Sequence, residues 1–265
     1  MKGENVGFER LTYIIKMKVL ITGASSGIGR DLAREFAKKK YYLVLVARNE
    51  EKLKRLKEEL KKDVKVSIIV ADLQKEENCK KVYEQAKDID ILINNAGFGV
   101  FGEFTKTSLE KEISLINTNI TAVHILTKLY LKDMLEKNSG TILNVSSIAG
   151  SMPGPLMCTY YASKAYVLRL SEGIREELKK QNSKVQISVL QPGPVDTNFN
   201  NVADVKFDLK SLTSQYVARY TVKKLLKGKF AIVPGFQIKL LRFIAKITPN
   251  NIMTKFIYRS QKRKR

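Results

Sequence analysis

The sequence predicts an α/β fold, a single domain built on a doubly wound parallel sheet with helices on both faces. Short and almost continuously apolar runs alternate with segments of helical spacing, a pattern typical of parallel strands buried on both sides. The chain has 265 residues, of which 44% are hydrophobic. One domain of this size can bury a substantial core.

Seven strands are expected, and each of the first five is followed by a helical segment. The helix at 29–40, for example, carries Leu32, Ala33 and Phe36 at helical spacing. In such sheets ligands bind at the carboxyl ends of the strands, where the winding reverses. The predicted strands are 18–23, 42–47, 65–72, 89–97, 140–147, 184–193 and 229–235.

The chain divides into three expected parts. Residues 1–16 are interrupted by charges and are expected to be a flexible leader. Residues 17–250 form the domain, including a substrate-pocket segment at 196–215, and residues 251–265 form a basic tail. No apolar run reaches the roughly 18 residues needed to span a bilayer.

The low cysteine and histidine content limits the kinds of catalytic site that the chain can form. Cys79 and Cys158 give neither a disulfide framework nor metal-ligand spacing, and His124 is the one histidine of the sequence. These facts disfavour zinc chemistry and a histidine-based triad, so no metal is expected. A reducing compartment, the cytoplasm, fits this cysteine usage best.

The formal net charge of +22 favours anionic partners. A phosphorylated cofactor, acidic lipid and nucleic acid all meet that description. No nucleic-acid-binding motif accompanies the charge, so no nucleic acid partner is expected. Part of the charge, as in 50–62, reads as a solvated helix face.

The segment TGASSGIG at 22–29 follows the first strand and opens the first helix. Gly23 allows a tight turn, Gly27 lets the backbone approach a pyrophosphate, and Gly29 lets the helix pack on the strand. The helix start offers free N–H groups to phosphate. An ordinary glycine-rich turn is the plain alternative. The expected cofactor contacts here are Gly23, Ser25, Ser26, Gly27, Ile28 and Gly29.

Three further strand ends bear on the nucleotide. After the second strand comes Arg48 where an acidic residue would bind the ribose of NAD, which favours NADP, although Arg48 also reads as a solvated cation. Asp72, beside Leu73, is placed either to reach an adenine or to cap the next helix. Asn95, Ala96 and Gly97 of NNAG suit a backbone lying against a flat ring, or simply a turn.

Five motifs together resemble one family. TGASSGIG, NNAG, NVSS (144–147), YYASK (160–164) and PGPVDTNF (192–199) occur in the order and spacing of short-chain dehydrogenases/reductases. The resemblance covers Lys18 to Phe199. It is closest to the single-domain branch with TGxxxGxG and YxxxK motifs, in a bacterial-type reductase subgroup. It implies a Rossmann-like fold and assembly as a homodimer or homotetramer.

The resemblance also implies residue roles. Tyr160 exchanges a proton with the substrate oxygen, and Lys164 holds the nicotinamide ribose. Ser147 binds the substrate carbonyl, and Asn119 anchors a water that leads to the lysine. Pro192 and Gly193 turn the chain past the nicotinamide, where Val195 and Thr197 contact the carboxamide and phosphate region.

Neighbouring residues compete for some of these roles. Tyr160 and Lys164 share a helix face at i and i+4, whereas Tyr161 occupies the variable position of the motif and Tyr166 reads as packing. Ser146 is the alternative to Ser147, and Asn117 the alternative to Asn119. The Lys164 charge is expected to lower the pKa of the Tyr160 phenol toward neutrality.

The expected pocket walls are Phe98, 152–158 and 199–212, which are apolar enough for a ketone on a hydrophobic body, and 200–211 reads as a mobile lid. The C-terminal segment 236–265 is predicted to cover the pocket or a subunit interface, and the alternative is contact with an anionic membrane surface. The sequence thus predicts an NADP-dependent oxidoreductase that interconverts a carbonyl and a secondary alcohol. The alternatives are an NADP-binding sensor and an anionic-surface binder.

Overall fold

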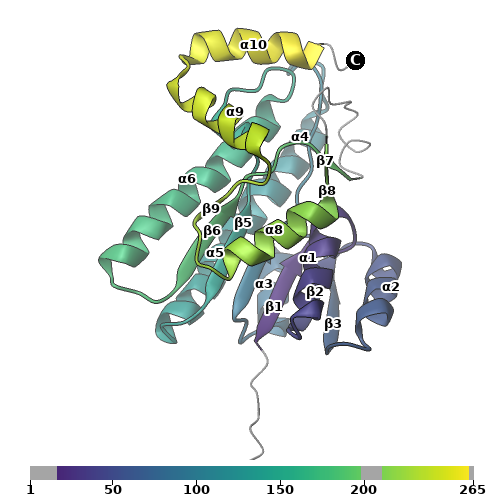
Figure 1. Ribbon diagram of the computed structural model, residues 1–265. Coiled ribbons are helices and arrows are strands. Elements are labelled where there is room, and N and C mark those ends of the chain that lie inside the picture. Colours follow the sequence, from purple (N-terminus) through teal and green to yellow (C-terminus); the bar gives the residue numbers. More distant parts are fainter. Residues whose placement is uncertain (1–16, 198–210, 263–265) are drawn as a thin grey trace, which may run out of the picture.

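Seven parallel strands form the central sheet of the computed structural model, which describes residues 17–197 and 211–262 (Figure 1). Their order is β3-β2-β1-β4-β5-β6-β9. The strands are β1 (Lys18–Thr22), β2 (Tyr42–Ala47), β3 (Val66–Val70), β4 (Ile91–Asn94), β5 (Thr141–Val145), β6 (Gln186–Leu190) and β9 (Ala231–Ile232). All seven predicted strands are present, which confirms the predicted fold class.

Helices cover both faces of this sheet. They are α1 (Gly27–Lys38), α2 (Glu50–Leu60) and α8 (Ser214–Leu225) on one face and α3 (Glu76–Gln85), α5 (Ala122–Glu136) and α6 (Cys158–Lys180) on the other. The other described helices are α4 (Leu109–Ile116), α9 (Phe236–Ile247) and α10 (Asn250–Lys262). Two short turns, the π-helical η1 (Asn117–Thr121) and the 3-10 helix η2 (Ile148–Ser151), stand before α5 and α6. Two short strands, β7 (Val195–Asp196) and β8 (Leu212–Thr213), pair apart from the main sheet.

Each face has its own core. On one side Leu32 and Phe36 of α1, Leu53 of α2 and Val217 of α8 pack against the sheet. On the other side α3, α5 and α6 do the same, and Tyr130 of α5 is the largest fully buried side chain there. Apolar side chains on alternate sides of one strand therefore serve both cores, as the continuous apolar runs predicted.

The winding of the sheet reverses between β1 and β4. The chain runs from β1 outward to β3 and then returns to place β4 on the other side of β1. Loops that leave these two strands diverge to opposite faces, and a crevice opens between them. The glycine turn follows β1 and NNAG ends β4, so both lie at this crevice.

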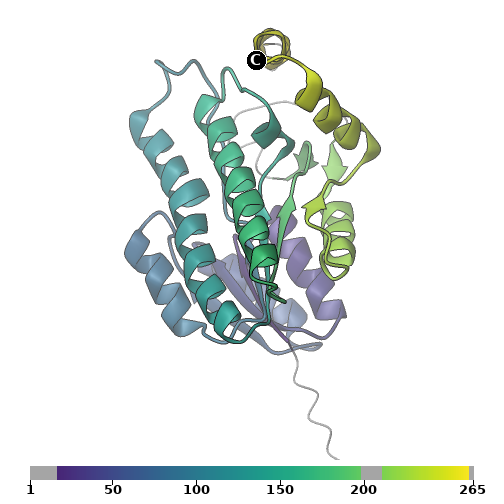
Figure 2. The same cartoon turned by 90° about the vertical axis from the view of Figure 1, so that its left-hand side faces the viewer.

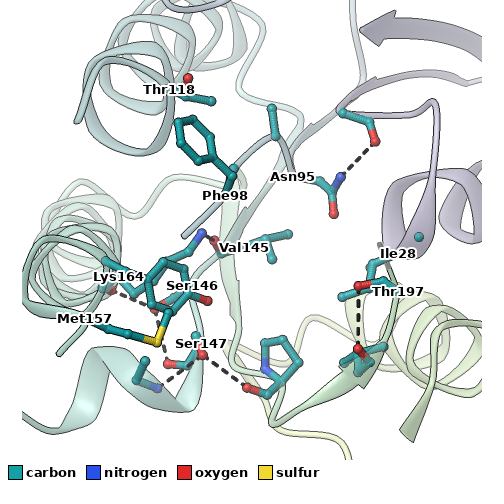
Figure 3. A pocket seen from close by; sticks show the side chains of 18 of the residues that line it. Ile28, Asn95, Phe98, Thr118, Val145, Ser146, Ser147, Met157, Lys164 and Thr197 are labelled. Carbon is teal, nitrogen blue, oxygen red and sulfur yellow. Dashed lines mark hydrogen bonds between the residues drawn. The ribbon is translucent and has the colours of Figure 1, made fainter. Parts of the chain in front are cut away.

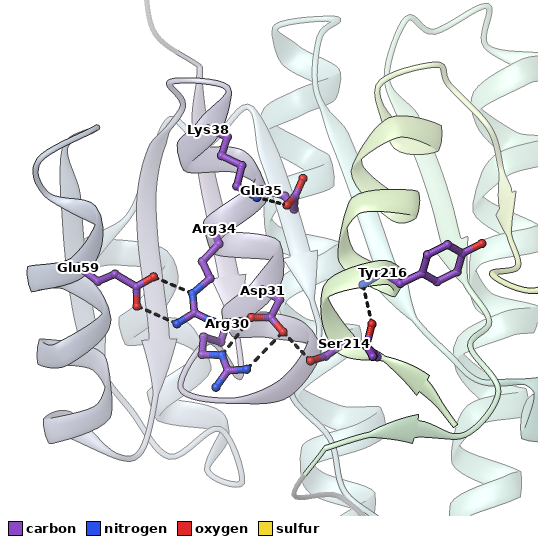
Figure 4. Close-up of polar contacts among 9 residues, drawn as sticks. Arg30, Asp31, Arg34, Glu35, Lys38, Glu59, Ser214 and Tyr216 are labelled. Carbon is purple, nitrogen blue, oxygen red and sulfur yellow. Dashed lines mark hydrogen bonds and ion pairs between the residues drawn. The ribbon is translucent and has the colours of Figure 1, made fainter. Parts of the chain in front are cut away.

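A polar cluster fastens α8 to α1 (Figure 4). The buried Asp31 carboxylate accepts hydrogen bonds from Ser214 at 2.5 Å and from Arg34 at 2.9 Å. Burial raises the pKa of Asp31, but the contacts with Arg30, Ser214 and Arg34 outweigh it and leave the pKa below its ordinary value. Arg34 also binds Glu59 of α2, so one cluster joins three helices.

The last two helices lie at the end toward which the strands point, as both views show (Figures 1 and 2). Residues 250–262, which fall largely in the predicted basic tail, form α10 and bury Met253, Ile257 and Gln261. Ile238 of α9 is buried against Ile148 of η2. No helix in residues 17–197 and 211–262 is long and apolar enough to cross a membrane.

Candidate active site

The glycine turn has the backbone that its sequence predicts. Gly23 and Gly27 have φ angles of +66° and +53°, a region that L side chains rarely adopt. A Cβ on Gly27 would stand 3.0 Å from the Thr197 methyl group. Ser26 occupies the N-cap of α1, but its side chain makes no capping hydrogen bond. The first N–H groups of α1 therefore lack a side-chain cap, as a phosphate-binding helix start requires.

Asn95 holds this turn in place. Its backbone N–H donates to Thr22 Oγ1 at 2.9 Å, and its side chain donates to the carbonyls of Thr22 and Gly23. A Cβ on Gly29 would stand 2.4 Å from both Asn95 Nδ2 and the Gly23 oxygen. Gly29 does not line the cavity, and it makes the close packing that was predicted for it.

Ser147 and Lys164 lie near each other in the cavity (Figure 3), and Tyr160, one helical turn before Lys164 on α6, lines the same cavity. A side-chain hydrogen bond joins Ser147 and Tyr160. Lys164 Nζ lies 5.8 Å from the centre of the Tyr160 ring and donates to the Val145 carbonyl at 2.9 Å. One helical turn separates the two residues, so both side chains leave the same face of α6.

The competing residues have other hydrogen-bond partners, although Ser146 and Tyr161 also line the cavity. Ser146 Oγ donates to the Lys164 carbonyl at 2.7 Å, so its hydroxyl fastens β5 to the α6 backbone. Tyr161 OH accepts a hydrogen bond from Gln261 of α10 at 2.9 Å. Tyr166 OH lies 2.7 Å from His124 Nδ1, between α6 and α5. Among the three tyrosines, Tyr160 is the one whose side chain meets Ser147.

Asn119 is fully buried in the π-helical turn η1. Its side chain donates to the Phe98 carbonyl at 2.9 Å and accepts from the Phe98 N–H at 3.1 Å. A Cβ on Gly97 would stand 2.9 Å from Asn119 Oδ1 and 3.2 Å from Lys164 Nζ, so glycine lets these groups approach. Asn117 is only half-buried and does not line the cavity.

Burial dominates the electrostatics of this group. It raises the pKa of Tyr160 above the ordinary value of a phenol, although the Ser147 hydrogen bond acts the other way. Burial also lowers the pKa of Lys164 to about 8. The expected lowering of the Tyr160 pKa by Lys164 is not found, because burial is the largest influence on the pKa and leaves it above its ordinary value.

At the far end of the crevice lie Arg48 and Asp72. Arg48 is exposed beside Asn49, whose side chain caps α2 by accepting from the Lys52 N–H. Asp72 Oδ1 accepts from the Gln74 N–H at 3.2 Å, while the N-cap of α3 is Lys75. The alternative that Asp72 caps this helix is therefore wrong, and its carboxylate faces the cavity instead.

One cavity of about 760 Å³ connects these groups. Every predicted site residue except Gly29 and Asn119 lines it. Of the predicted pocket walls, Phe98, Met152 and Met157 line the cavity, whereas 199–210, which include all of the predicted lid except Ser211, fall outside the described residues. The residues that sequence analysis missed include Asn49, Lys52, Gln74, Glu110, Lys111, Ser114, Thr118, Leu241, Phe256, Ile257, Ser260 and Gln261.

The lining residues from α4, α9 and α10 belong to no sequence motif. The one sequence signal for them was the prediction that the C-terminal segment covers the pocket. Gly193 makes room for α9: a Cβ there would stand 2.3 Å from Ile238. A glycine is needed at position 193 because α9, which follows about 40 residues later, packs directly against it.

Comparison with known proteins agrees with this geometry. A family model described as short chain dehydrogenase matches residues 17–206. The very-long-chain 3-oxoacyl-CoA reductase of Anas platyrhynchos is 36% identical over 71% of this chain and 63% of its own length. The chain thus spans less than two thirds of that relative. The ketoacyl reductase HetN of Nostoc sp. is 32% identical over 91% of this chain and 88% of its own.

The fold also matches that of a solved structure. The short-chain dehydrogenase from Sphingobium yanoikuyae, in complex with NADPH, superposes with a TM-score of 0.81 and is 28% identical. The match covers 90% of this chain and 95% of that one. The similarity therefore extends beyond the region of the family model into the C-terminal helices.

Proposed function

The chain belongs to the short-chain dehydrogenase family, and on that premise we propose that it is an NADP(H)-dependent oxidoreductase interconverting a carbonyl and a secondary alcohol. The observation that carries this proposal is the convergence of Tyr160, Ser147 and Lys164 on the cavity that begins at the glycine turn. A proton donor and a cation thus line the same cavity as the glycine turn.

The glycine turn fits a dinucleotide. Gly23 and Gly27 keep the space in front of α1 free of Cβ atoms, and the start of α1 has no side-chain cap. Together with Asn95, Ala96 and Gly97 and with Ile28, Pro192, Val195 and Thr197, they would hold a nicotinamide cofactor. That cofactor, when bound, supplies or accepts the hydride.

The residues of the chain handle the proton. Ser147 would hold the substrate oxygen beside the Tyr160 hydroxyl, since the two side chains already share a hydrogen bond. Because burial raises the pKa of Tyr160, the phenol is protonated at neutral pH and ready to donate. Lys164 stabilises the phenolate left behind, and Asn119 positions the Phe98 backbone and Gly97 against the lysine.

Arg48 and the neighbouring Lys52 support the preference for NADP(H). Both line the adenine end of the cavity, and no carboxylate follows β2 where a ribose hydroxyl would need one. Asp72 and Leu73 would border the adenine at the next strand end. The NADPH complex of the Sphingobium relative agrees with this assignment.

The substrate end of the cavity favours an apolar ketone. Met152, Met157, Leu241, Phe256 and Ile257 contribute apolar lining to the cavity that Ser147 also lines. Both curated relatives are named as reductases of acyl-chain ketones, so ketones on an aliphatic chain come first in a screen. Assembly into a homodimer or homotetramer and a cytoplasmic location remain predictions.

Two measurements test the proposed function. Fluorescence titration of the protein with NADPH and with NADH should show the tighter binding for NADPH. A panel of aliphatic and cyclic ketones should then include compounds that oxidise NADPH. Preference for NADH would overturn the reading of Arg48 and leave the reductase. Tight NADPH binding with no turnover of any carbonyl would favour the sensor, and no binding of either would overturn the cofactor site.

A further inference from the structure

Helix α9 exposes a continuous apolar stripe. Phe236, Leu240, Phe243, Ile244 and Ile247 recur at i, i+4, i+7, i+8 and i+11, which places them on one side of the helix. Their exposed fractions run from 40% for Ile244 to 80% for Phe236. The opposite side of α9 buries Ile238, so the exposed stripe is not the side that packs on the domain.

Helix α10 carries two more exposed apolar residues. Ile252 and Phe256, one turn apart, are 57% and 62% exposed, while Met253 and Ile257 on the neighbouring side are buried. Figures 1 and 2 both show α9 and α10 as consecutive helices at one end of the molecule. We call these seven exposed residues the apolar face. Contiguous exposed apolar side chains of this extent mark an interaction surface.

The charges carried by α9 and α10 themselves have one sign. No Asp or Glu follows Asp208 in the sequence. In contrast, α9 and α10 carry Lys239, Arg242, Lys246, Lys255, Arg259 and Lys262. On α9, Lys239 and Lys246 are exposed along one flank of the stripe. Apolar residues on one side of a helix and cations beside them are typical of helices that lie in a membrane interface.

We propose that α9 and α10 dock the protein on the surface of a bilayer that contains anionic phospholipids. The cations would meet phosphate and carboxylate headgroups while the apolar face enters the boundary of the acyl chains. A second copy of the chain is disfavoured as the occupant, because it would bring the same uncompensated cations to the contact. The surface lies outside the catalytic residues and does not depend on the proposed function.

The apolar face adjoins the cavity. Phe256 is both exposed and part of the cavity lining, together with Leu241 of α9 and Ile257 of α10. Docking would therefore bring the substrate end of the cavity next to the acyl chains, where an apolar ketone concentrates. The supply of ketone from the acyl chains rests on the proposed function, whereas the docking itself does not.

Flotation with lipid vesicles tests the docking. The protein should float with vesicles of phosphatidylcholine and phosphatidylglycerol and not with vesicles of phosphatidylcholine alone. Leu240→Asp should weaken binding about tenfold or more, because a charge replaces an apolar side chain in the interface. The matched control is Leu226→Asp at the C-cap of α8, since Leu226 is 42% exposed among Lys223, Lys224 and Lys227 without an apolar stripe.

The control separates the apolar face from the overall charge. With a net charge of +22 the protein would be drawn to anionic vesicles through any basic surface. Equal loss of binding in Leu240→Asp and Leu226→Asp would overturn the proposal, as would failure of the unmodified protein to float. If Leu240→Asp instead splits a dimer in the absence of lipid, a second copy covers this face and the proposal is wrong.

Tryptophan fluorescence can detect docking directly, without relying on a variant that loses vesicle binding. The sequence contains no Trp, so Leu240→Trp reports this position alone. Its emission should shift to the blue with anionic vesicles, whereas that of Leu226→Trp should not. Turnover of a water-dispersed ketone should be the same in Leu240→Asp and the unmodified protein, so a failed docking test and a failed oxidoreductase test are distinguishable.

Discussion

Asn119 donates a hydrogen bond to Ser163 Oγ at 3.0 Å, which joins the π-helical turn to the segment of α6 between Tyr160 and Lys164. Ser163 in turn donates to the Tyr160 carbonyl at 2.7 Å. Asn119 thus reaches both the backbone under the proton donor and, through Phe98, the loop that follows β4. An irregular turn of this kind is frequent at functional sites.

Replacing Asn119 should damage stability and activity together. Asn119→Ala leaves the Phe98 N–H and carbonyl without their partner in a buried place, at a cost of about 3 kcal/mol. We expect denaturant unfolding to show that loss and kcat to fall as the α6 start shifts. Asn117→Ala, a change to a half-buried residue two positions earlier, should leave kcat close to that of the unmodified protein. Equal effects of the two changes would contradict the role of Asn119 in holding the Phe98 backbone and the start of α6.

Two glycine-to-alanine changes should have opposite effects. Gly29→Ala places a methyl 2.4 Å from Asn95 Nδ2 and from the Gly23 oxygen, and overpacking of this kind costs about 1–3 kcal/mol. Gly173→Ala, in the middle of α6, meets nothing within 4 Å and should stabilise the protein by about 1 kcal/mol through helix propensity. Urea unfolding measures both, and a Gly29→Ala variant as stable as the unmodified protein would contradict the packing argument.

The Arg48 guanidinium should distinguish the two cofactors. Arg48→Ala is expected to weaken NADPH binding about tenfold or more, the loss of a hydrogen bond between charged groups, and to leave NADH binding unchanged. Arg55→Ala removes the same charge from an 82% exposed side chain of α2 and serves as the control. Fluorescence titration would refute the assignment if Arg48→Ala weakened both cofactors equally.

Stability should rise with pH through the titration of Lys164. Its folded pKa is about 8 and its ordinary value 10.5, so between these values the unfolded chain holds the proton that the folded protein lacks. The penalty for burying the charge is therefore present below pH 8 and gone above pH 10.5. The full difference corresponds to about 3 kcal/mol.

The comparison needs a variant, because burial raises the pKa of Cys79 to about 11 and acts in the opposite direction. Lys164→Met should be more stable relative to the unmodified protein at pH 7 than at pH 10.5. Lys180→Met removes an exposed charge from the same helix and should show no such trend in urea unfolding. A constant difference between Lys164→Met and the unmodified protein would show that Lys164 is not buried as a cation.

The fold and the central site could be predicted because the information is local. Apolar runs identify the strands, and Gly23, Tyr160 and Lys164 belong to motifs of fixed spacing. Strand ends were predicted too long, as with 89–97 against Ile91–Asn94, because the polar residues that follow each strand still read as extended chain. A helix cap at Asp72 was wrong because a turn intervenes before α3.

Tertiary contacts set what the sequence could not predict. The pKa of Tyr160 depends on how completely the surrounding helices exclude water, which no motif records. The contributions of Phe256 and Ser260 to the cavity depend on where α10 lies against Tyr161 and Met157. The spacing of residues along the chain does not predict such contacts between segments that are far apart in the sequence.

The most direct measurement is the rate at which Tyr160→Phe oxidises NADPH with a ketone that the unmodified protein reduces. Loss of the proton donor should lower kcat by at least about 100-fold while NADPH still binds. Tyr161→Phe, which loses only the hydrogen bond from Gln261, should keep nearly full activity. Full turnover by Tyr160→Phe would contradict the account, since the proton would then come from another group.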